Sequence, residues 1–370
     1  MKLYIIAGEA SGDLHGSNLI KALKLQKSGL QCRVWGGELM QNAGGELVKH
    51  YRDLAFMGFV EVLKNLRTIF RNIAFCKKDI LDFQPDALVL IDYPGFNLRI
   101  AKWAKKQGIK VIYYISPQIW AWHTSRVHSI RRDVDKMLVI LPFEKDFYKK
   151  YEVEAEFVGH PLLDAVQQFR EKEGNSSTAE VDVVSRKLIV LLPGSRRQEV
   201  QRILPPMLEV TKDFPDYDFV VAAAASLPQE FYQPYLEKYQ KVQWQQGRTY
   251  ELLSRARVAL IKSGTSTLET ALFDVPEVVC YAGSPISYHI ARRLVDIKYI
   301  SLVNLIMDRP LVRELIQDEL NRTNLKAALA EILTPEKAAE IREGYAALRK
   351  LLGDGGASER AAGEILNFLG

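Results

Sequence analysis

Short apolar runs, each followed by a turn of small residues and then by a helical pattern, recur in both halves of this 370-residue chain. Parallel strands that are buried on both faces have this appearance, and the segments between them cross over as helices. The pattern therefore predicts an α/β fold with two Rossmann-like βαβ domains that face each other across a cleft. The predicted strands are Leu3–Ala7, Cys32–Trp35, Ala87–Ile91, Lys110–Ile115 and Met137–Leu141 in the first half, and Leu188–Leu192, Phe219–Ala224, Val258–Ile261 and Glu277–Tyr281 in the second.

A polar segment separates the two predicted domains. Residues 167–187 include the run Gly174-Asn175-Ser176-Ser177-Thr178 and read as a linker, because such breaker-rich stretches add little to a buried core. The N-terminal domain is therefore predicted to span 1–166 and the C-terminal domain 188–348. A further helix is expected over 349–370, where it can cross back to the N-terminal domain.

Composition is typical of a cytoplasmic globular protein. The net charge of +5 permits an acidic substrate or an anionic surface without requiring one. The three cysteines are far apart and form no CxxC pair, which argues against a disulfide framework or a zinc site. No apolar run approaches the ~18 residues that would span a bilayer. We expect no metal, no other cofactor and no nucleic-acid partner.

The turn after the strand Val258–Ile261 is a candidate phosphate site. Ser263, Gly264 and Thr265 lie between this strand and the next helix, where backbone N–H groups and the helix dipole attract an anion. Glu269 follows one turn into the helix, where its carboxylate could bind two ribose hydroxyls. The alternative is that the hydroxyl residues only cap the helix and that Glu269 is solvated.

A second candidate anion site follows the strand Leu188–Leu192. Gly194, Ser195 and Arg196 precede a helix there, and an arginine fork can bind a diphosphate through two hydrogen bonds. A cation at a helix start is otherwise unfavourable, which supports a role in binding.

In the first half, carboxylates follow two strands. Glu9, Ser11 and Asp13 lie in the glycine-rich turn after Leu3–Ala7, and Asp92 follows Ala87–Ile91 in a Pro-Gly turn. Ligands of open α/β sheets bind at such strand ends, so Asp92 is a candidate general base toward a hydroxyl. The alternatives are turn chemistry for Asp92 and a solvated or capping role for Asp13.

Two aromatic stretches complete the candidate surface. Residues 56–78 combine helical apolar spacing with interleaved lysine and arginine, as in a helix that lies in a bilayer interface or receives acyl chains, although a sheet-packing helix with a basic face fits as well. Met57, Phe59 and Val60 belong to this stretch. Trp120 and Trp122 occur in a loop after Lys110–Ile115, where they would line a site or pack a lid.

Together these motifs resemble the lipid-A-disaccharide synthases, glycosyltransferases with the two-Rossmann-domain GT-B architecture. The resemblance covers nearly the whole chain, and the Gly8–Asp13 and Trp-Ala-Trp motifs are the most family-specific. The matching motifs are Gly8–Asp13, Met57–Leu63, Asp92–Asn97, Ser116–Trp122, Leu141–Lys145, Leu192–Arg196, Ser263–Thr265 with Glu269, and Asn304-Leu305 with Gln317–Glu319.

The resemblance implies an inverting, metal-independent hexosyltransferase of lipid A (lipopolysaccharide) biosynthesis. Such an enzyme joins UDP-2,3-diacylglucosamine to 2,3-diacylglucosamine 1-phosphate (lipid X), giving a β-1,6-linked disaccharide 1-phosphate and UDP. The N-terminal domain would bind the acceptor and the C-terminal domain the UDP-sugar. The enzyme would lie on the cytoplasmic face of the inner membrane as a peripheral protein, and a homodimer is left open.

The resemblance also implies residue roles. Asp92 would be the base, with Glu9 as the fallback, and Ser11, Met57, Phe59, Val60, Trp120 and Trp122 would contact the acceptor or lipid. Gly194, Ser195, Arg196, Ser263, Gly264, Thr265, Glu269, Asn304 and Gln317 would bind the donor. Gly95 departs from the family pattern by replacing a second aspartate, as do Arg255 and Arg257 before the strand Val258–Ile261. The rival readings are a UDP-N-acetylglucosamine 2-epimerase-like GT-B enzyme and a non-catalytic nucleotide-sugar-binding membrane scaffold.

Overall fold

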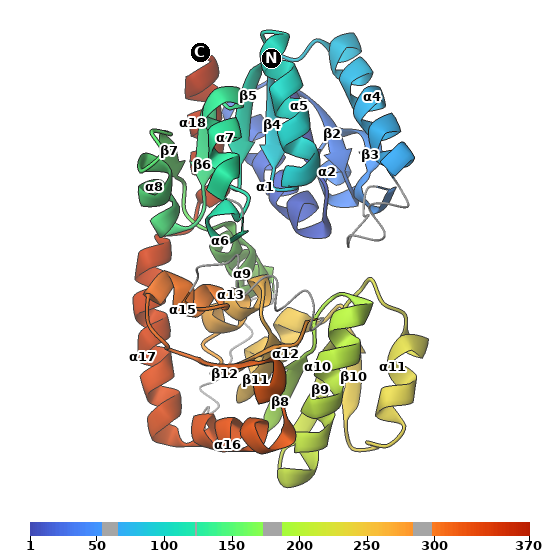
Figure 1. Ribbon diagram of the computed structural model, residues 1–370, viewed down its shortest axis with the longest axis vertical. Coiled ribbons are helices and arrows are strands. Elements are labelled where there is room, and N and C mark those ends of the chain that lie inside the picture. Colours follow the sequence, from blue (N-terminus) through green and yellow to red (C-terminus); the bar gives the residue numbers. More distant parts are fainter. Residues whose placement is uncertain (54–65, 123, 173–186, 284–297) are drawn as a thin grey trace. The chain divides into compact units, whose positions relative to one another are not determined.

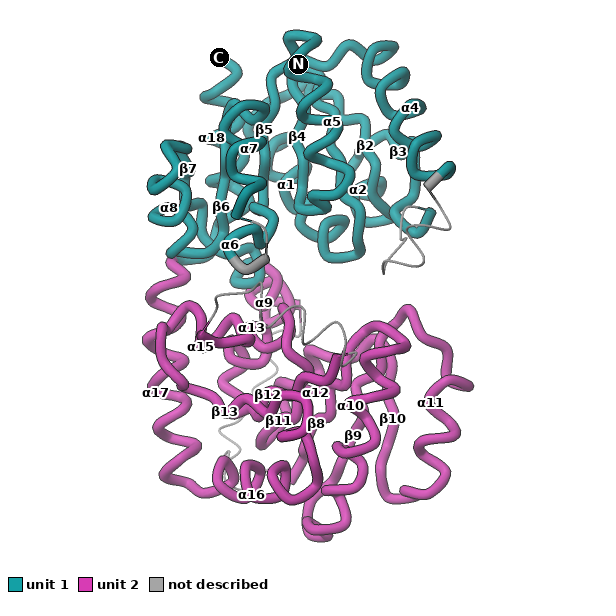
Figure 2. Tube along the Cα trace, in the orientation of Figure 1, with its two compact units in different colours: residues 1–164, 354–370 teal, residues 165–353 magenta. Residues whose placement is uncertain are grey.

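The computed structural model describes residues 1–53, 66–122, 124–172, 187–283 and 298–370. It contains two compact units, Met1–Asp164 with Asp354–Gly370, and Ala165–Gly353 (Figure 2). The chain leaves unit 1 within helix α9 (Pro161–Lys172) and returns to it after Gly353. The predicted linker, 167–187, begins inside α9, and its residues 173–186 lie outside the described residues.

Unit 1 is built on a parallel sheet in the order β3-β2-β1-β4-β5-β6-β7 among its described residues. The order reverses at β1, so β1 and β4 flank a switch point, and the register pairs Ala7 with Ile91 at the ends of these strands. The strands are β1 (Lys2–Ala7), β2 (Gln31–Gly36), β3 (Glu46–His50), β4 (Ala87–Ile91), β5 (Lys110–Tyr114), β6 (Lys136–Val139) and β7 (Ala155–Phe157).

Helices cover both faces of this sheet, as the crossovers of a parallel sheet require (Figure 1). The helix α18 returns from the far end of the chain and packs beside α1. The helices of unit 1 are α1 (Ala10–Gln26), α2 (Glu38–Asn42), α4 (Leu66–Phe83), α5 (Pro94–Lys106), α6 (Ile119–Trp122), α7 (Val127–Asp133), α8 (Pro142–Lys149) and α18 (Ala357–Leu369), with 3₁₀ turns η1 (Tyr51–Asp53) and η2 (Thr124–Arg126).

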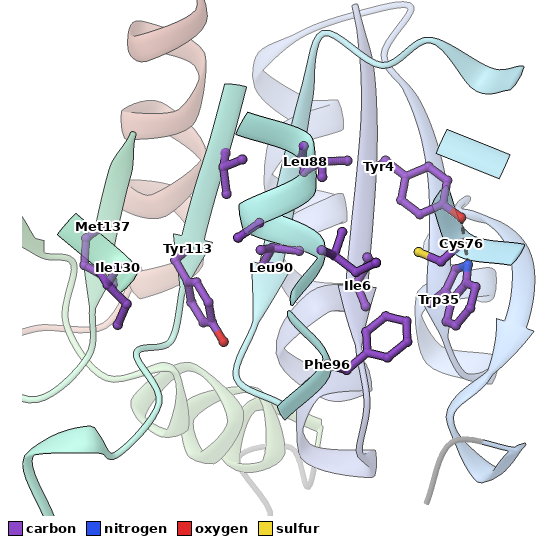
Figure 3. Packing of buried hydrophobic residues seen from close by; sticks show 14 of the residues in the cluster. Tyr4, Ile6, Trp35, Cys76, Leu88, Leu90, Phe96, Tyr113, Ile130 and Met137 are labelled. Atoms are coloured by element: carbon purple, nitrogen blue, oxygen red, sulfur yellow. Dashed lines mark hydrogen bonds between the residues drawn. The ribbon is translucent and has the colours of Figure 1, made fainter. Parts of the chain in front are cut away.

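The core of unit 1 includes a buried polar chain among aromatic rings (Figure 3). The Trp35 indole donates to the Tyr4 hydroxyl at 2.7 Å, and this hydroxyl donates to Asp79 at 2.6 Å. Asp79 pairs in turn with Arg33 at 3.1 Å. These contacts tie α4, which carries Asp79, to Tyr4 of β1 and Arg33 of β2.

Unit 2 has a second parallel sheet, in the order β10-β9-β8-β11-β12-β13 among its described residues. Here the order reverses at β8, so β8 and β11 flank the switch point. The strands are β8 (Leu188–Leu192), β9 (Asp218–Ala223), β10 (Gln243–Gln246), β11 (Val258–Lys262), β12 (Glu277–Tyr281) and β13 (Arg313–Ile316). The helices are α10 (Arg197–Val210), α11 (Gln229–Leu236), α12 (Thr249–Arg255), α13 (Thr265–Leu272), α15 (Leu302–Met307), α16 (Arg322–Leu333) and α17 (Pro335–Leu352), with 3₁₀ turns η4 (Thr211–Asp213) and η5 (Gln317–Glu319).

Candidate functional site

Asp92 lies directly beyond β4, at the switch point of unit 1, in a left-handed backbone conformation. Its φ is 44° and that of Tyr93 is 48°, and each such non-glycine residue costs about 1–3 kcal/mol. Hydrogen bonds hold the Asp92 peptide in place: its carbonyl accepts from the Tyr113 hydroxyl at 2.5 Å and from the Asn97 amide at 2.8 Å. Its N–H donates to the Ile115 carbonyl at 3.2 Å. Strained backbone that is held this firmly is characteristic of functional sites.

The turn after β1 is shaped to fit this loop. A Cβ atom at Gly8 would lie 2.3 Å from the Tyr93 ring, so only glycine allows the two turns to approach. Glu9 follows at the N-cap of α1 and is partly buried. Ser11 is exposed in the first turn of the same helix. Gly8 thus allows Asp92, the predicted base, and Glu9, the predicted fallback base, to lie at the same edge of the sheet.

The carboxyl group of Asp92 is tuned toward neutral pH. Burial, and then the negative charge of Glu9, raise the pKa of Asp92 from 3.8 to about 6. A general base works best when its pKa lies near the operating pH. A pKa of about 6 suits a general base, and the catalytic role of Asp92 stays a prediction.

Asp13 has the capping role that was the alternative to a polar contact. Its buried carboxylate accepts from the backbone N–H groups of Gly37 at 2.7 Å, Leu39 at 3.2 Å and Met40 at 3.0 Å. These donors form the start of α2, so Asp13 satisfies the N-terminus of a neighbouring helix. The Gly8–Asp13 motif identified the Asp13 carboxylate, but the sequence did not predict which N–H groups it binds.

Glu144 joins the aromatic loop after β5 to the end of β6. Its buried side chain accepts from the Trp120 indole at 3.3 Å, from Leu141 N at 2.9 Å and from Ile140 N at 3.2 Å. Burial raises the pKa of Glu144 to about 7, against the effect of these hydrogen bonds. The Trp120 ring packs edge-on against Phe143 at 5.0 Å between centroids. The sequence analysis included Glu144 in the Leu141–Lys145 motif but did not predict that it binds Trp120 and the backbone after β6. Trp122 ends α6.

In unit 2, the turn after β8 has backbone N–H donors that already bind a carboxylate of the protein. Its backbone N–H groups at Ser195 and Arg196 donate to Glu199 at 3.2 and 3.3 Å. Gly194 has a φ of 113°, which favours glycine. The Arg196 side chain is exposed, 3.6 Å from Glu199. The sequence identified the turn but not the carboxylate that occupies its donors.

The turn after β11 places its residues in different environments. The Ser263 hydroxyl is buried and donates to the Ile300 carbonyl at 2.7 Å, whereas Thr265 is exposed. Gly264 is extended, with a φ of 161°, so its conformation alone does not require glycine. Glu269 accepts from the Tyr250 hydroxyl at 2.8 Å, and burial raises the pKa of Glu269. Tyr250 therefore orients Glu269, the residue predicted to bind the ribose, and the sequence analysis did not identify Tyr250.

Asn304 and Gln317 both bind the backbone of unit 2. The buried Asn304 side chain donates to the Val312 carbonyl at 2.8 Å and to Glu314 at 2.9 Å, and it accepts from Val312 N at 2.9 Å. Gln317 has a φ of 55° and accepts from Gly283 N at 2.8 Å. These contacts show how the two side chains are held and leave the predicted donor contacts untested.

The unexpected arginines before β11 have structural positions. Arg257 is buried and donates to the Leu333 carbonyl at 3.1 Å, at the carboxyl end of α16. Arg255 is exposed in the last turn of α12. Cations are favourable at the carboxyl ends of helices, which accounts for both departures.

Part of the predicted lipid surface can be described. Met57, Phe59 and Val60 lie outside the described residues, as does all of 56–65, and α4 contains the remaining part of the stretch, 66–78. Ile73, Cys76 and Ile80 pack into the core, while Phe70 is 59% exposed and Phe75 is 47% exposed. No helix in the described part of the chain is long and apolar enough to cross a membrane. Within the same residues, no three His, Cys, Asp or Glu side chains form a group that could hold a metal ion.

Comparison with known proteins shows the family of this chain. The family model described as lipid-A-disaccharide synthetase matches residues 3–364. The chain belongs to this family. The lipid-A-disaccharide synthase of Geobacter metallireducens is 41% identical over 376 residues, covering 100% of this chain and 97% of the relative. The enzyme of that name from Trichlorobacter lovleyi is 40% identical over 374 residues, again covering 100% and 97%.

Solved structures confirm the two-domain GT-B fold of this lipid-A-disaccharide synthase family member. A UDP-GlcNAc 2-epimerase from Neisseria meningitidis, bound to UDP-GlcNAc, matches with a TM-score of 0.71 and 14% identity over 99% of this chain and 100% of its own. A Methanocaldococcus jannaschii UDP-GlcNAc 2-epimerase, in complex with UDP-GlcNAc and UDP, matches with a TM-score of 0.66 and 14% identity over 100% of both chains. At this identity the likeness concerns the fold alone.

Proposed function

We propose that the chain transfers the diacylglucosaminyl group of UDP-2,3-diacylglucosamine to the 6-hydroxyl of lipid X. The products are the β-1,6-linked lipid A disaccharide 1-phosphate and UDP. The family match over residues 3–364 supports the reaction. The observation that carries the mechanism is the Asp92 carboxyl, held beyond β4 with its pKa raised to about 6.

In this mechanism Asp92 accepts the proton of the acceptor 6-hydroxyl while the hydroxyl oxygen attacks the anomeric carbon. The bond from that carbon to the UDP oxygen breaks, and the anomeric configuration inverts. The proton ends on Asp92 and the electron pair of the broken bond on UDP. Glu9 keeps the carboxyl basic through its negative charge and is the fallback base.

The donor is assigned to unit 2. Arg196 would bind the diphosphate and stabilise the charge that develops on UDP, with Gly194, Ser195, Ser263, Gly264 and Thr265 forming the phosphate turns. Glu269, oriented by Tyr250 at 2.8 Å, would bind the ribose. Asn304 and Gln317 would act through the backbone that they hold. Metal independence is part of the proposal, and chelator in the assay tests it.

The acceptor and the membrane are assigned to unit 1. The exposed side of α4 carries Arg67, Phe70, Arg71, Phe75 and Lys78. Cationic and aromatic side chains on one side of a helix suit the interface of an anionic bilayer. Attachment to the cytoplasmic face of the inner membrane is part of the proposal, with Ser11 and Trp120 as predicted contacts of the acceptor or lipid. A homodimer stays a prediction.

A product assay tests this function. Protein in detergent and chelator receives UDP-2,3-diacylglucosamine and lipid X, and products are identified by mass spectrometry. We expect a disaccharide 1-phosphate and UDP from the native chain and from Asp146→Asn, an exposed aspartate of α8. Asp92→Asn should lose about 10²–10⁴-fold in turnover, the usual value of a general base. Full turnover by Asp92→Asn would refute the mechanism. Epimerisation of UDP-N-acetylglucosamine in a parallel reaction, with no disaccharide from the lipid substrates, would favour the rival enzyme.

A further inference from the structure

Two cations from neighbouring turns share one carboxylate at the switch point of unit 2. Lys262 ends β11, and its ammonium lies 3.0 Å from Glu199 Oε1. The Arg196 guanidinium, from the turn after β8, lies 3.6 Å from the same oxygen. Because β8 and β11 are adjacent strands, the cluster joins the two turns assigned to the donor phosphates.

The other oxygen of Glu199 fills the backbone part of this site. Glu199 Oε2 accepts from Ser195 N and Arg196 N, at 3.2 and 3.3 Å. A Cβ atom on Gly194 would lie 2.6 Å from this oxygen, so the carboxylate lies close against the turn. One internal anion therefore bonds two backbone donors and two cationic side chains, the kind of set that binds a phosphate.

The Lys262 ammonium lies beside Gly264, in the turn assigned to the donor phosphates. Among the described residues, a Cβ atom built on Gly264 would come within 4 Å of the Lys262 ammonium alone, at 3.6 Å. The Lys262 side chain is 20% exposed and that of Glu199 17% exposed, so neither is fully buried. The cluster carries two positive charges against one negative charge, and the surplus favours a further anion.

We propose that Lys262 is a diphosphate-binding residue of the nucleotide-sugar site, and that Glu199 is an internal anion that holds Lys262 and Arg196 in place before the nucleotide binds. The inference rests on the proposed function, because it assigns further residues to the same donor site. When the diphosphate binds, Lys262 turns its ammonium from Glu199 toward a phosphate oxygen. Glu199 stays on the backbone N–H groups of the turn.

The two residues then have opposite effects on affinity. Lys262 attracts the diphosphate, so its loss weakens binding. Glu199 repels the diphosphate, so neutralising its charge strengthens binding. A purely structural ion pair predicts a different result, since breaking it from either side would disorder the same turn and weaken binding in both variants.

Calorimetric titration with UDP measures affinity without turnover, so it separates this inference from the transfer reaction. Lys262→Met should weaken UDP binding about 10- to 100-fold, the value of one hydrogen bond to a charged group. Lys262→Arg should retain most of the affinity. Glu199→Gln keeps an acceptor for the turn and should bind UDP severalfold more tightly. Lys241→Met is the matched control, because Lys241 is an exposed lysine just before the edge strand β10. This variant should bind UDP as the native chain does. Thermal unfolding of each variant checks that it is folded.

Native affinity in Lys262→Met would overturn the assignment of Lys262. Weakened binding in a folded Glu199→Gln would overturn the role of Glu199 as an internal competitor. If the native chain does not bind UDP at all, both the inference and the donor site fail. If it binds UDP but forms no disaccharide from the two lipid substrates, the proposed function fails while the titrations still decide the roles of Lys262 and Glu199.

Discussion

Replacing the predicted base should stabilise the fold at neutral pH while it removes activity. Asp92 has an ordinary pKa of 3.8 and a folded pKa of about 6, so the folded chain binds the proton more tightly than the unfolded chain does. Well below pH 3.8 the carboxyl is protonated in both states, so its ionisation does not change the free energy of unfolding. As the pH rises from 3.8 through 6, the folded state loses stability relative to the unfolded state.

The size of this loss follows from the shift. One pKa unit corresponds to about 1.36 kcal/mol, so the rise of about two units amounts to about 3 kcal/mol above pH ~6. Asparagine at position 92 is neutral at every pH and avoids this cost. Asp92→Asn should therefore unfold at a higher temperature than the native chain at pH 7.5, and the difference should shrink to near zero toward pH 4.

Thermal unfolding followed by circular dichroism over a pH series measures this difference. Asp146→Asn, whose aspartate is exposed, provides the control and should show no comparable pH-dependent gain. An Asp92→Asn variant that is less stable than the native chain at pH 7.5 would contradict the reasoning. So would a gain that is equally large at pH 4.5, because protonation of Asp92 could not then be its cause.

Three further changes test neighbouring parts of the structure. Glu9→Gln removes the negative charge that, after burial, raises the pKa of Asp92, so the acidic limb of kcat/KM should move to lower pH. Complete loss of activity would instead identify Glu9 as the base. Asp13→Ala leaves the backbone N–H groups at the start of α2 without their acceptor, so denaturant unfolding should show that the free energy of unfolding falls by about 2–4 kcal/mol. The variant should still bind UDP as the native chain does, which checks that unit 2 is intact. The double variant Phe70→Ser, Phe75→Ser should bind anionic vesicles several times more weakly in a sedimentation assay, whereas the exposed Leu351→Ser on α17 should bind as the native chain does.

The sequence predicted the central strands but missed the outer ones. The strands β1, β4, β8 and β11 are continuous apolar runs because helices bury both of their faces. The strands that went unpredicted, β3, β7, β10 and β13, are the edges of the two sheets. Edge strands are short and keep polar residues, as in Gln243–Gln246, so hydrophobic pattern alone does not reveal them.

The candidate site was also only partly predictable from the sequence. Turn composition located the switch-point loops, because glycine and small residues must follow strands that end at a ligand site. The partners of the charged residues could not be predicted. Glu199 meets Lys262, and Asp13 meets Gly37, only because strands that are distant in sequence lie side by side. For the same reason, the raised pKa of Asp92 depends on its burial in the folded chain and then on the charge of Glu9, which lies far away in sequence.

The return of the chain to unit 1 affects the order in which the protein can be completed during synthesis. Helix α18 packs beside α1, Lys136 pairs with Glu364 at 2.6 Å, and Asp164 accepts from Gly356 N at 2.6 Å. Unit 2 is contiguous and can fold as soon as it has left the ribosome. Unit 1 begins first but must wait for α18, which is translated after all of unit 2. The nascent chain therefore carries the predicted catalytic half in an unfinished state, with the α1 surface uncovered, until the nucleotide-binding half has been made.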